Sequence, residues 1–81
     1  MILSANTPVN TGYTGSQQPI IQNLGPGNIY IGTSSANLST TGLYLPAGAV
    51  YEFPATIVEG AGQVWIEADA GSTDVRIINV G

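Results

Sequence analysis

The fold is decided by residues 63–80, which read QVWIEADAGSTDVRIINV. Apolar and polar side chains alternate on both sides of a short turn at residues 70–73, and this period of two is typical of half-buried β-strands joined by a tight connection. Symmetric pairing about the turn predicts a hairpin with three facing pairs: Ile66 with Ile77, Trp65 with Ile78, and Glu67 with Arg76. One face of this hairpin is apolar and would enter the core, and it carries Val64, Ile66, Ala68, Val75 and Ile77.

Working outward, the chain contains further short β-branched runs between Gly- and Pro-rich turns, at residues 19–23, 28–32, 43–45, 49–53 and 55–58. Pro26 and Gly27 suit the central positions of a type II turn. This turn predicts a second hairpin, with Ile21 opposite Tyr30 and Ile20 opposite Ile31. The polar connection at residues 33–42 contains Leu38, which we expect to drop back onto the core as a plug. About six or seven short strands predict an all-β domain, a small antiparallel β-sandwich or barrel.

Residues 1–18 show neither a helical nor a strand period, and we interpret them as an extended N-terminal arm that precedes a single small β-domain at residues 19–81. The arm is either a disordered tail or a segment that orders against a neighbouring subunit, with Val9 and Tyr13 as its anchors. It has no basic segment followed by a long apolar core, so we expect no signal peptide. No run approaches the roughly 18 apolar residues that span a bilayer. These features predict that the chain is made and used in a cytoplasm, or in something assembled there.

Charge is scarce in this chain. Five acids and one arginine are its charged residues, there is no Lys, His or Cys, and the net charge is −4. Nucleophilic and acid–base catalysis would rely on carboxylates alone, so we expect no enzyme and no cofactor. A single cation also argues against nucleic acid and anionic membranes as partners. Small domains without disulfides or metals commonly gain stability by assembly.

Two polar groups are candidate sites. Asp69 and Asp74 would face each other at the last turn, where hard oxygen ligands suit Ca²⁺, although exposed acids at a turn are ordinarily just solvated. Glu67 and Arg76 would form a cross-strand ion pair that either lies in solvent or fixes the register of a subunit contact.

Large apolar side chains on the outer face of the last hairpin are the main interface signal. Trp65 and Ile78 stand there beside few charges, which favours a surface covered by protein, either a second subunit or a loop or arm of the same chain. The candidate interface residues are therefore Val9, Tyr13, Trp65, Glu67, Arg76 and Ile78.

Three phrases resemble small β-rich structural proteins of tailed bacteriophages, at residues 23–32 (NLGPGNIYIG), 42–48 (GLYLPAG) and 64–77 (VWIEADAGSTDVRI). The shared patterns are an N-L-G-P-x-x-V-Y-I-G hairpin, a G-x-x-L-x-A-G turn and a closing A-x-x-G-x-x-x-V-R-V hairpin. The resemblance implies a capsid decoration or head-fibre protein of the virion. It also implies a homo-oligomer, commonly a trimer at a three-fold position, that binds the major capsid protein on the outside of a head assembled in the host cytoplasm. The alternative is a fibre-associated module that recognises a host-surface glycan or protein through its aromatic residues.

Overall fold

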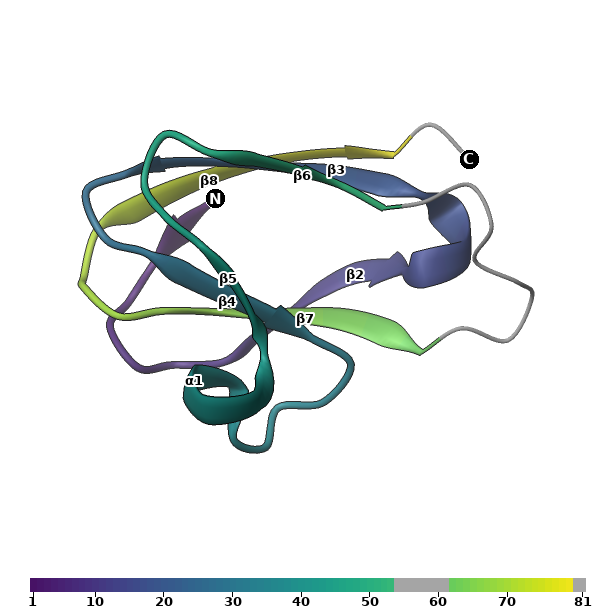
Figure 1. The fold of residues 1–81 in the computed structure, drawn as a ribbon, viewed down its shortest axis with the longest axis horizontal. Helices are drawn as coiled ribbons and strands as arrows, with labels where there is room; N and C mark the ends of the chain where they lie inside the picture. Colours follow the sequence, from purple (N-terminus) through teal and green to yellow (C-terminus); the bar gives the residue numbers. More distant parts are fainter. Residues whose placement is uncertain (54–61, 80–81) are drawn as a thin grey trace.

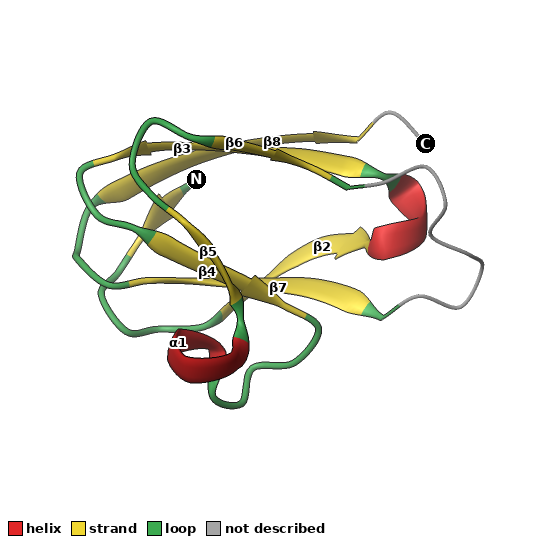
Figure 2. Cartoon of the chain, viewed as in Figure 1, coloured by secondary structure: helices red, strands yellow, loops and turns green. Residues whose placement is uncertain are grey.

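The computed structural model describes residues 1–53 and 62–79, and these residues form two antiparallel four-stranded sheets packed face to face (Figures 1 and 2). Sheet A has the strand order β1 (Ile2–Leu3), β8 (Thr73–Asn79), β3 (Pro19–Gly25) and β6 (Val50–Glu52). Sheet B has the order β2 (Val9–Thr14), β7 (Gln63–Ala68), β4 (Ile29–Gly32) and β5 (Leu43–Leu45). A 3₁₀ turn, η1 (Gly15–Gln17), and one helical turn, α1 (Leu38–Thr41), complete the fold. The predicted all-β sandwich is confirmed, and the strand expected at residues 55–58 lies outside the described residues.

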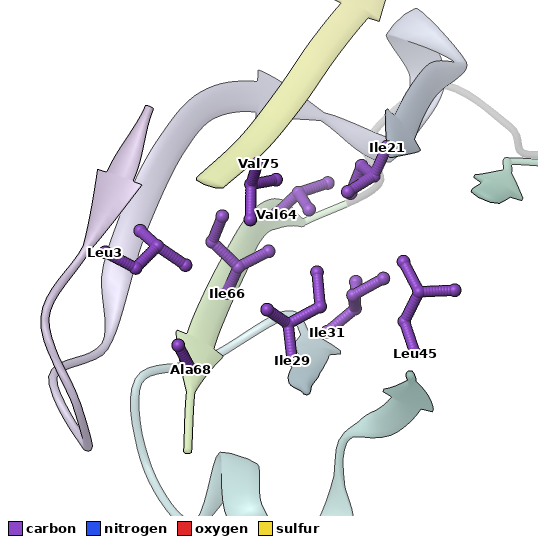
Figure 3. Packing of buried hydrophobic residues seen from close by; sticks show 9 residues of the cluster. All are labelled: Leu3, Ile21, Ile29, Ile31, Leu45, Val64, Ile66, Ala68 and Val75. Carbon is purple, nitrogen blue, oxygen red and sulfur yellow. The ribbon is translucent and has the colours of Figure 1, made fainter. Parts of the chain in front are cut away.

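The core lies between the two sheets. Its side chains come from alternate positions of the strands, and Figure 3 shows those of sheet A and sheet B pointing toward one another. The cluster consists of Leu3, Ile21, Ile29, Ile31, Leu45, Val64, Ile66, Ala68 and Val75. Four of the five side chains predicted for the inner face of the last two strands are in this cluster, and Ile77 packs against it while partly buried. The period-two prediction of which side chains face inward is therefore confirmed for these strands.

Neither predicted hairpin forms. β7 belongs to sheet B and β8 to sheet A, and likewise β3 belongs to sheet A and β4 to sheet B. Each connection is thus an arch, in which the two strands face each other across the core instead of pairing edge to edge (Figure 1). The predicted pairs across these two turns are wrong, because an arch and a hairpin direct the same alternate residues inward and the pattern alone does not separate them. The real neighbours of β8 are β1 and β3, and those of β4 are β5 and β7.

The turn between β3 and β4 also differs from the type II prediction. The Gly25–Pro26 peptide bond is cis, and the residue with positive φ is Gly25, at +85°, not Gly27. Gly27 is needed for a different reason. A Cβ at this position would lie 2.6 Å from the Thr73 hydroxyl oxygen and 2.8 Å from an Asp69 carboxylate oxygen, so the two arches touch here.

Two buried polar side chains hold the arches together. The Asn23 amide nitrogen donates to the carbonyl oxygens of Gly27 and Leu45, both at 3.0 Å, while its oxygen accepts a 2.9 Å hydrogen bond from the Gly25 N–H. The Thr73 hydroxyl accepts from the Gly27 N–H at 3.1 Å and donates to the Ala70 carbonyl at 2.7 Å. Asn23 and Thr73 are fully buried. These hydrogen bonds satisfy the Gly25 and Gly27 N–H groups and the Gly27, Leu45 and Ala70 carbonyls.

The N-terminal residues are part of the sandwich. β1 pairs with β8 through Ile2 and Asp74, and β2 pairs with β7 through Val9 and Ile66. The predicted arm separate from the domain is therefore wrong over both strands. The sequence shows no period here because β1 has two residues and β2 is interrupted by an irregularity between Asn10 and Thr14.

α1 covers part of the outer face of sheet B. The buried Leu38 side chain lies over Gly32, where an added Cβ would come within 2.5 Å of a Leu38 methyl group. Figure 1 shows α1 on the far side of sheet B from sheet A. Leu38 is buried as predicted, but the prediction that it drops onto the core is wrong, because it covers the outside of sheet B over Gly32.

Candidate functional site

The outer face of sheet A carries a row of exposed apolar side chains. Successive side chains of a strand point to opposite faces, so the neighbours of the buried residues in each strand point away from the core. Their exposed fractions are 66% for Ile2, 45% for Leu24, 51% for Val50 and 60% for Ile78. Ile20, the neighbour of Ile78 across the β3–β8 ladder, extends this apolar surface while half-buried. We call these five residues the sheet A patch.

A shallow hollow of about 250 Å³ lies within the sheet A patch. Its walls include Ile20, Val50 and Ile78 from the patch, together with the stems of Gln22 and Arg76. Gln22 is the register partner of both Arg76 and Val50, so these three side chains form one row across the sheet. Polar and charged side chains thus lie among the apolar ones in each of these rows across the face.

Three charged side chains lie on this face: Asp74 and Arg76 form an ion pair, and Glu52 is exposed beside its register partner Ile20. The Arg76 guanidinium donates to both carboxylate oxygens of Asp74, through Nε at 3.2 Å and Nη2 at 3.0 Å. These hydrogen bonds lower the pKa of the Asp74 carboxyl, partial desolvation acts in the opposite direction, and the positive charges of Arg76 and of the N-terminal amine lower it further. The N-terminal nitrogen of Met1 lies 3.9 Å from the same carboxylate and donates to the Val75 carbonyl at 2.9 Å. The predicted pair of Arg76 with Glu67 is wrong, because these residues lie on different sheets.

The outer face of sheet B presents a carboxylate beside two tyrosines. Glu67 is the register partner of Tyr30, and Tyr30 is that of Tyr44, so the three residues form one row across β7, β4 and β5. The rings of Tyr30 and Tyr44 have centroids 5.7 Å apart and are tilted by 51°. Tyr44 is 57% exposed, whereas Glu67 is only 9% exposed. We call this row the sheet B row.

The remaining interface candidates are dispersed. Trp65 lies on the outer face of sheet B, half-buried between its register partners Asn10 and Gly32. Val9 points inward and packs against the core. Tyr13 lines a hollow between β2 and β8 together with Met1, Thr11, Arg76 and Ile78. The six predicted interface residues therefore do not share one face, and the contacts proposed for them stay predictions.

The two acids of the proposed Ca²⁺ site are separated by their partners. Asp69 accepts hydrogen bonds from the backbone and side-chain nitrogens of Asn28, at 2.8 and 3.0 Å, which ties β7 to the β3–β4 arch. Asp74 is engaged with Arg76 instead. Within residues 1–53 and 62–79 no three His, Cys, Asp or Glu side chains come close enough to hold a metal ion. The arch explains the difference, since it sends the two strands to opposite sheets.

No family model, curated protein or solved structure matches this chain. Among the described residues, no helix is both long enough and apolar enough to span a bilayer.

Sequence reasoning missed most of the sheet A patch and the aromatic part of the sheet B row. Ile20 and Val50 were assigned to strands but not to a surface, because their orientation depends on which sheet each strand joins. Tyr30 and Tyr44 lie in adjacent runs of the sequence with the same Ile/Leu flanks, in IYI and LYL. That repeated pattern is a usable signal, since a polar-tipped aromatic between two inward aliphatics points outward from a sheet.

Proposed function

We propose that this chain is a structural protein of a tailed-bacteriophage virion, a decoration or cement subunit on the outside of the head. In this proposal it associates with copies of itself, as a trimer, and with the major capsid protein. The observation that carries the proposal is the sheet A patch, whose apolar side chains remain open to solvent in the single chain. Several large apolar side chains exposed on one face of a small domain are typical of a protein-binding face.

The physical mechanism is burial of this patch against neighbouring protein. Each square ångström of apolar surface removed from water contributes about 25 cal/mol, less the cost of fixing the subunit in place. A shell subunit gains these contacts only when its neighbours are in position, so the contacts oppose rupture of the shell from within. The low charge of the chain serves the same role, because few ions need to be desolvated when its faces are covered.

The resemblance to phage structural proteins supports the class of particle. Its three phrases coincide with the two arches and with the strands and turn around β5, which are the parts of the chain that join the sheets. The three phrases therefore bear on the fold of the sandwich, whereas the sheet A patch bears on its contacts with other proteins.

The experiment compares purified particles made with and without this chain. We expect mass spectrometry to find the chain in intact particles at a fixed ratio to the major capsid protein. We also expect particles without it to release DNA at a lower temperature. Adding back the purified protein should restore the rupture temperature, and the Val50→Ser, Ile78→Ser double variant should restore it less well. Absence of the chain from purified particles, or equal rupture temperatures, would contradict the proposal.

A further inference from the structure

We propose that the outer face of sheet A binds the same face of a second copy of this chain, with Arg76 of one copy paired to Glu52 of the next. The inference rests on the proposed function, because it names the contact through which the proposed trimer assembles. It starts from the sheet A patch, whose apolar side chains are exposed in the single chain. The charges at the two borders of this face then identify what covers it.

Glu52 and Arg76 lie at opposite borders of the face. β6 is the last strand of sheet A on one side, and Glu52 points outward from it because Tyr51 packs against the core. On the other side, β1 accompanies β8 only as far as Val75, which exchanges hydrogen bonds with Met1. Among the described residues, no strand pairs with β8 on that side beyond Val75. Arg76 therefore lies at the border, and its side chain is 64% exposed.

The β8 border is able to bind a second carboxylate. The Arg76 guanidinium binds Asp74 through Nε and Nη2, and it has more N–H donors than these two hydrogen bonds use. The N-terminal nitrogen of Met1 lies 3.9 Å from the same Asp74 carboxylate. Two positive groups thus stand beside one negative group at this border, whereas the β6 border carries the acid Glu52. The two borders are complementary in charge.

This complementarity favours a second copy of the chain as the partner. Outside sheet A, the charged side chains of the described residues are Glu67 and Asp69, and both are acids. Copies that met through sheet B would bring like charges together, which opposes association. Copies that meet through sheet A bring the β8 border of one copy to the Glu52 carboxylate of the other. Self-association through sheet A therefore follows from the distribution of charge.

The contact fits the proposed trimer because it joins unlike borders. A contact between two different parts of the same surface is heterologous, and it closes into a ring when repeated around an axis. With the sheet A faces turned toward that axis, the β8 border of each copy meets the β6 border of the next. Arg76 shares a row with Val50, and Glu52 shares the next row with Ile78. The offset of two residues is about 7 Å along a strand, which two long side chains span.

The test exchanges the two charges. Sedimentation velocity over a concentration series is run on the parent protein, on Arg76→Glu, on Glu52→Arg and on the double variant that carries both changes. We expect each single reversal to weaken association at least about tenfold, since like charges then meet between copies. The double variant should recover most of the loss, because the facing charges are opposite again. Circular dichroism of each variant reports whether it is folded.

Two sets of variants serve as controls. Arg76→Gln and Glu52→Gln remove a charge without adding a like one, so they should weaken association less, and they provide the test if a reversal prevents folding. Ser39→Glu and Ser39→Arg change the net charge at an exposed position of α1, on the other side of the molecule. Both Ser39 variants should associate as the parent does.

Four results would overturn the contact. The first is a parent protein that stays monomeric at all concentrations, and the second is unchanged association of the folded Arg76 and Glu52 variants. The third is a double variant that associates no better than the single reversals. The fourth is variants that bind particles more weakly but associate with one another normally, which would assign the face to the capsid protein. Mass spectrometry of purified particles tests the proposed function separately, because it detects the chain in a virion whatever the variants show.

Discussion

The side-chain amide of Asn23 in sheet A donates a 3.0 Å hydrogen bond to the carbonyl oxygen of Leu45 in sheet B. Asn23 is fully buried, and its other hydrogen bonds end on Gly25 and Gly27 in the β3–β4 arch. One polar side chain therefore joins the two layers and fixes the path of the chain between them. Its three hydrogen bonds need two N–H donors and one oxygen acceptor on the same group, a combination that a carboxylate or an aliphatic group of the same size lacks.

Replacing Asn23 with Ala should destabilise the protein by about 3 kcal/mol, because it leaves buried backbone groups of Gly25, Gly27 and Leu45 without partners. Urea unfolding followed by tryptophan fluorescence measures this loss through Trp65. Gln22→Ala is the control on the same strand, since Gln22 is exposed. Equal unfolding midpoints for the two variants would show that the amide does not join the layers.

Gly27→Ala should cost about 1–3 kcal/mol by overpacking, because the new methyl group would lie 2.6 Å from the Thr73 oxygen and 2.9 Å from the Ala70 Cβ. Gly71→Ala provides the matched control in the neighbouring arch, where the nearest atom to an added Cβ is 4.0 Å away. Thermal unfolding of the two variants compares them directly. A larger loss at Gly71 would contradict the described contact between the arches.

The Asp74–Arg76 pair predicts a dependence of stability on acid pH. The folded-state pKa of Asp74 is lowered from 3.8, so its contribution to stability is present above that value and is lost as pH falls through the lower folded-state pKa. Removing the hydrogen bonds with Arg76→Gln should raise the titration midpoint of the Asp74 carboxyl carbon in an NMR experiment. Gln22→Ala, which leaves the pair intact, should not move it. An unchanged midpoint in Arg76→Gln would mean that the guanidinium does not bind this carboxylate in solution.

Ile78→Ser should weaken self-association without a large change in folding stability, since its side chain is 60% exposed in the single chain. The loss of one large apolar contact corresponds to about 1.5–3 kcal/mol if the side chain is fully covered in the oligomer. Sedimentation velocity over a concentration series measures the shift in the association midpoint. Leu43→Ser, which changes an exposed side chain on β5 of sheet B, serves as the comparison. If Leu43→Ser has the larger effect, the sheet A patch is not the self-contact.

The alternation of side chains was readable from the sequence, and it identified the all-β class and the inward residues of β7 and β8. The partners of each strand were not readable. Ile66 and Val75 face inward whether their strands pair in one sheet or oppose each other in two, so the choice depends on the buried contacts at the turn. Those contacts come from Asn23 and Thr73. Each is a single polar residue in or beside a predicted strand, so the sequence does not distinguish it from an ordinary strand residue.

For the candidate surfaces too, the direction of a side chain was predictable from the sequence and the pairing of the strands was not. Ile78 was recognised as an outward side chain of β8, and in the single chain it is 60% exposed. Its neighbours Ile20 and Val50 were not recognised, because they reach the same face only through the order β8-β3-β6. Glu67 and Arg76 were expected to neutralise each other, and the arch instead gives each of them a different sheet. The outward direction of a single side chain was thus predictable, whereas the set of side chains that share one face depended on the order of the strands.

The position of β8 inside sheet A has a consequence for how the chain acquires its structure. This strand is the last one in the described sequence, yet it lies between β1, the first strand, and β3. β1 and β3 are joined in sheet A only through β8, so sheet A cannot be completed before β8 pairs with both. Such non-local pairing is slow compared with hairpin formation and leaves strand edges available to other chains. Removing β8 would leave β1 and β3 without the partner that they share.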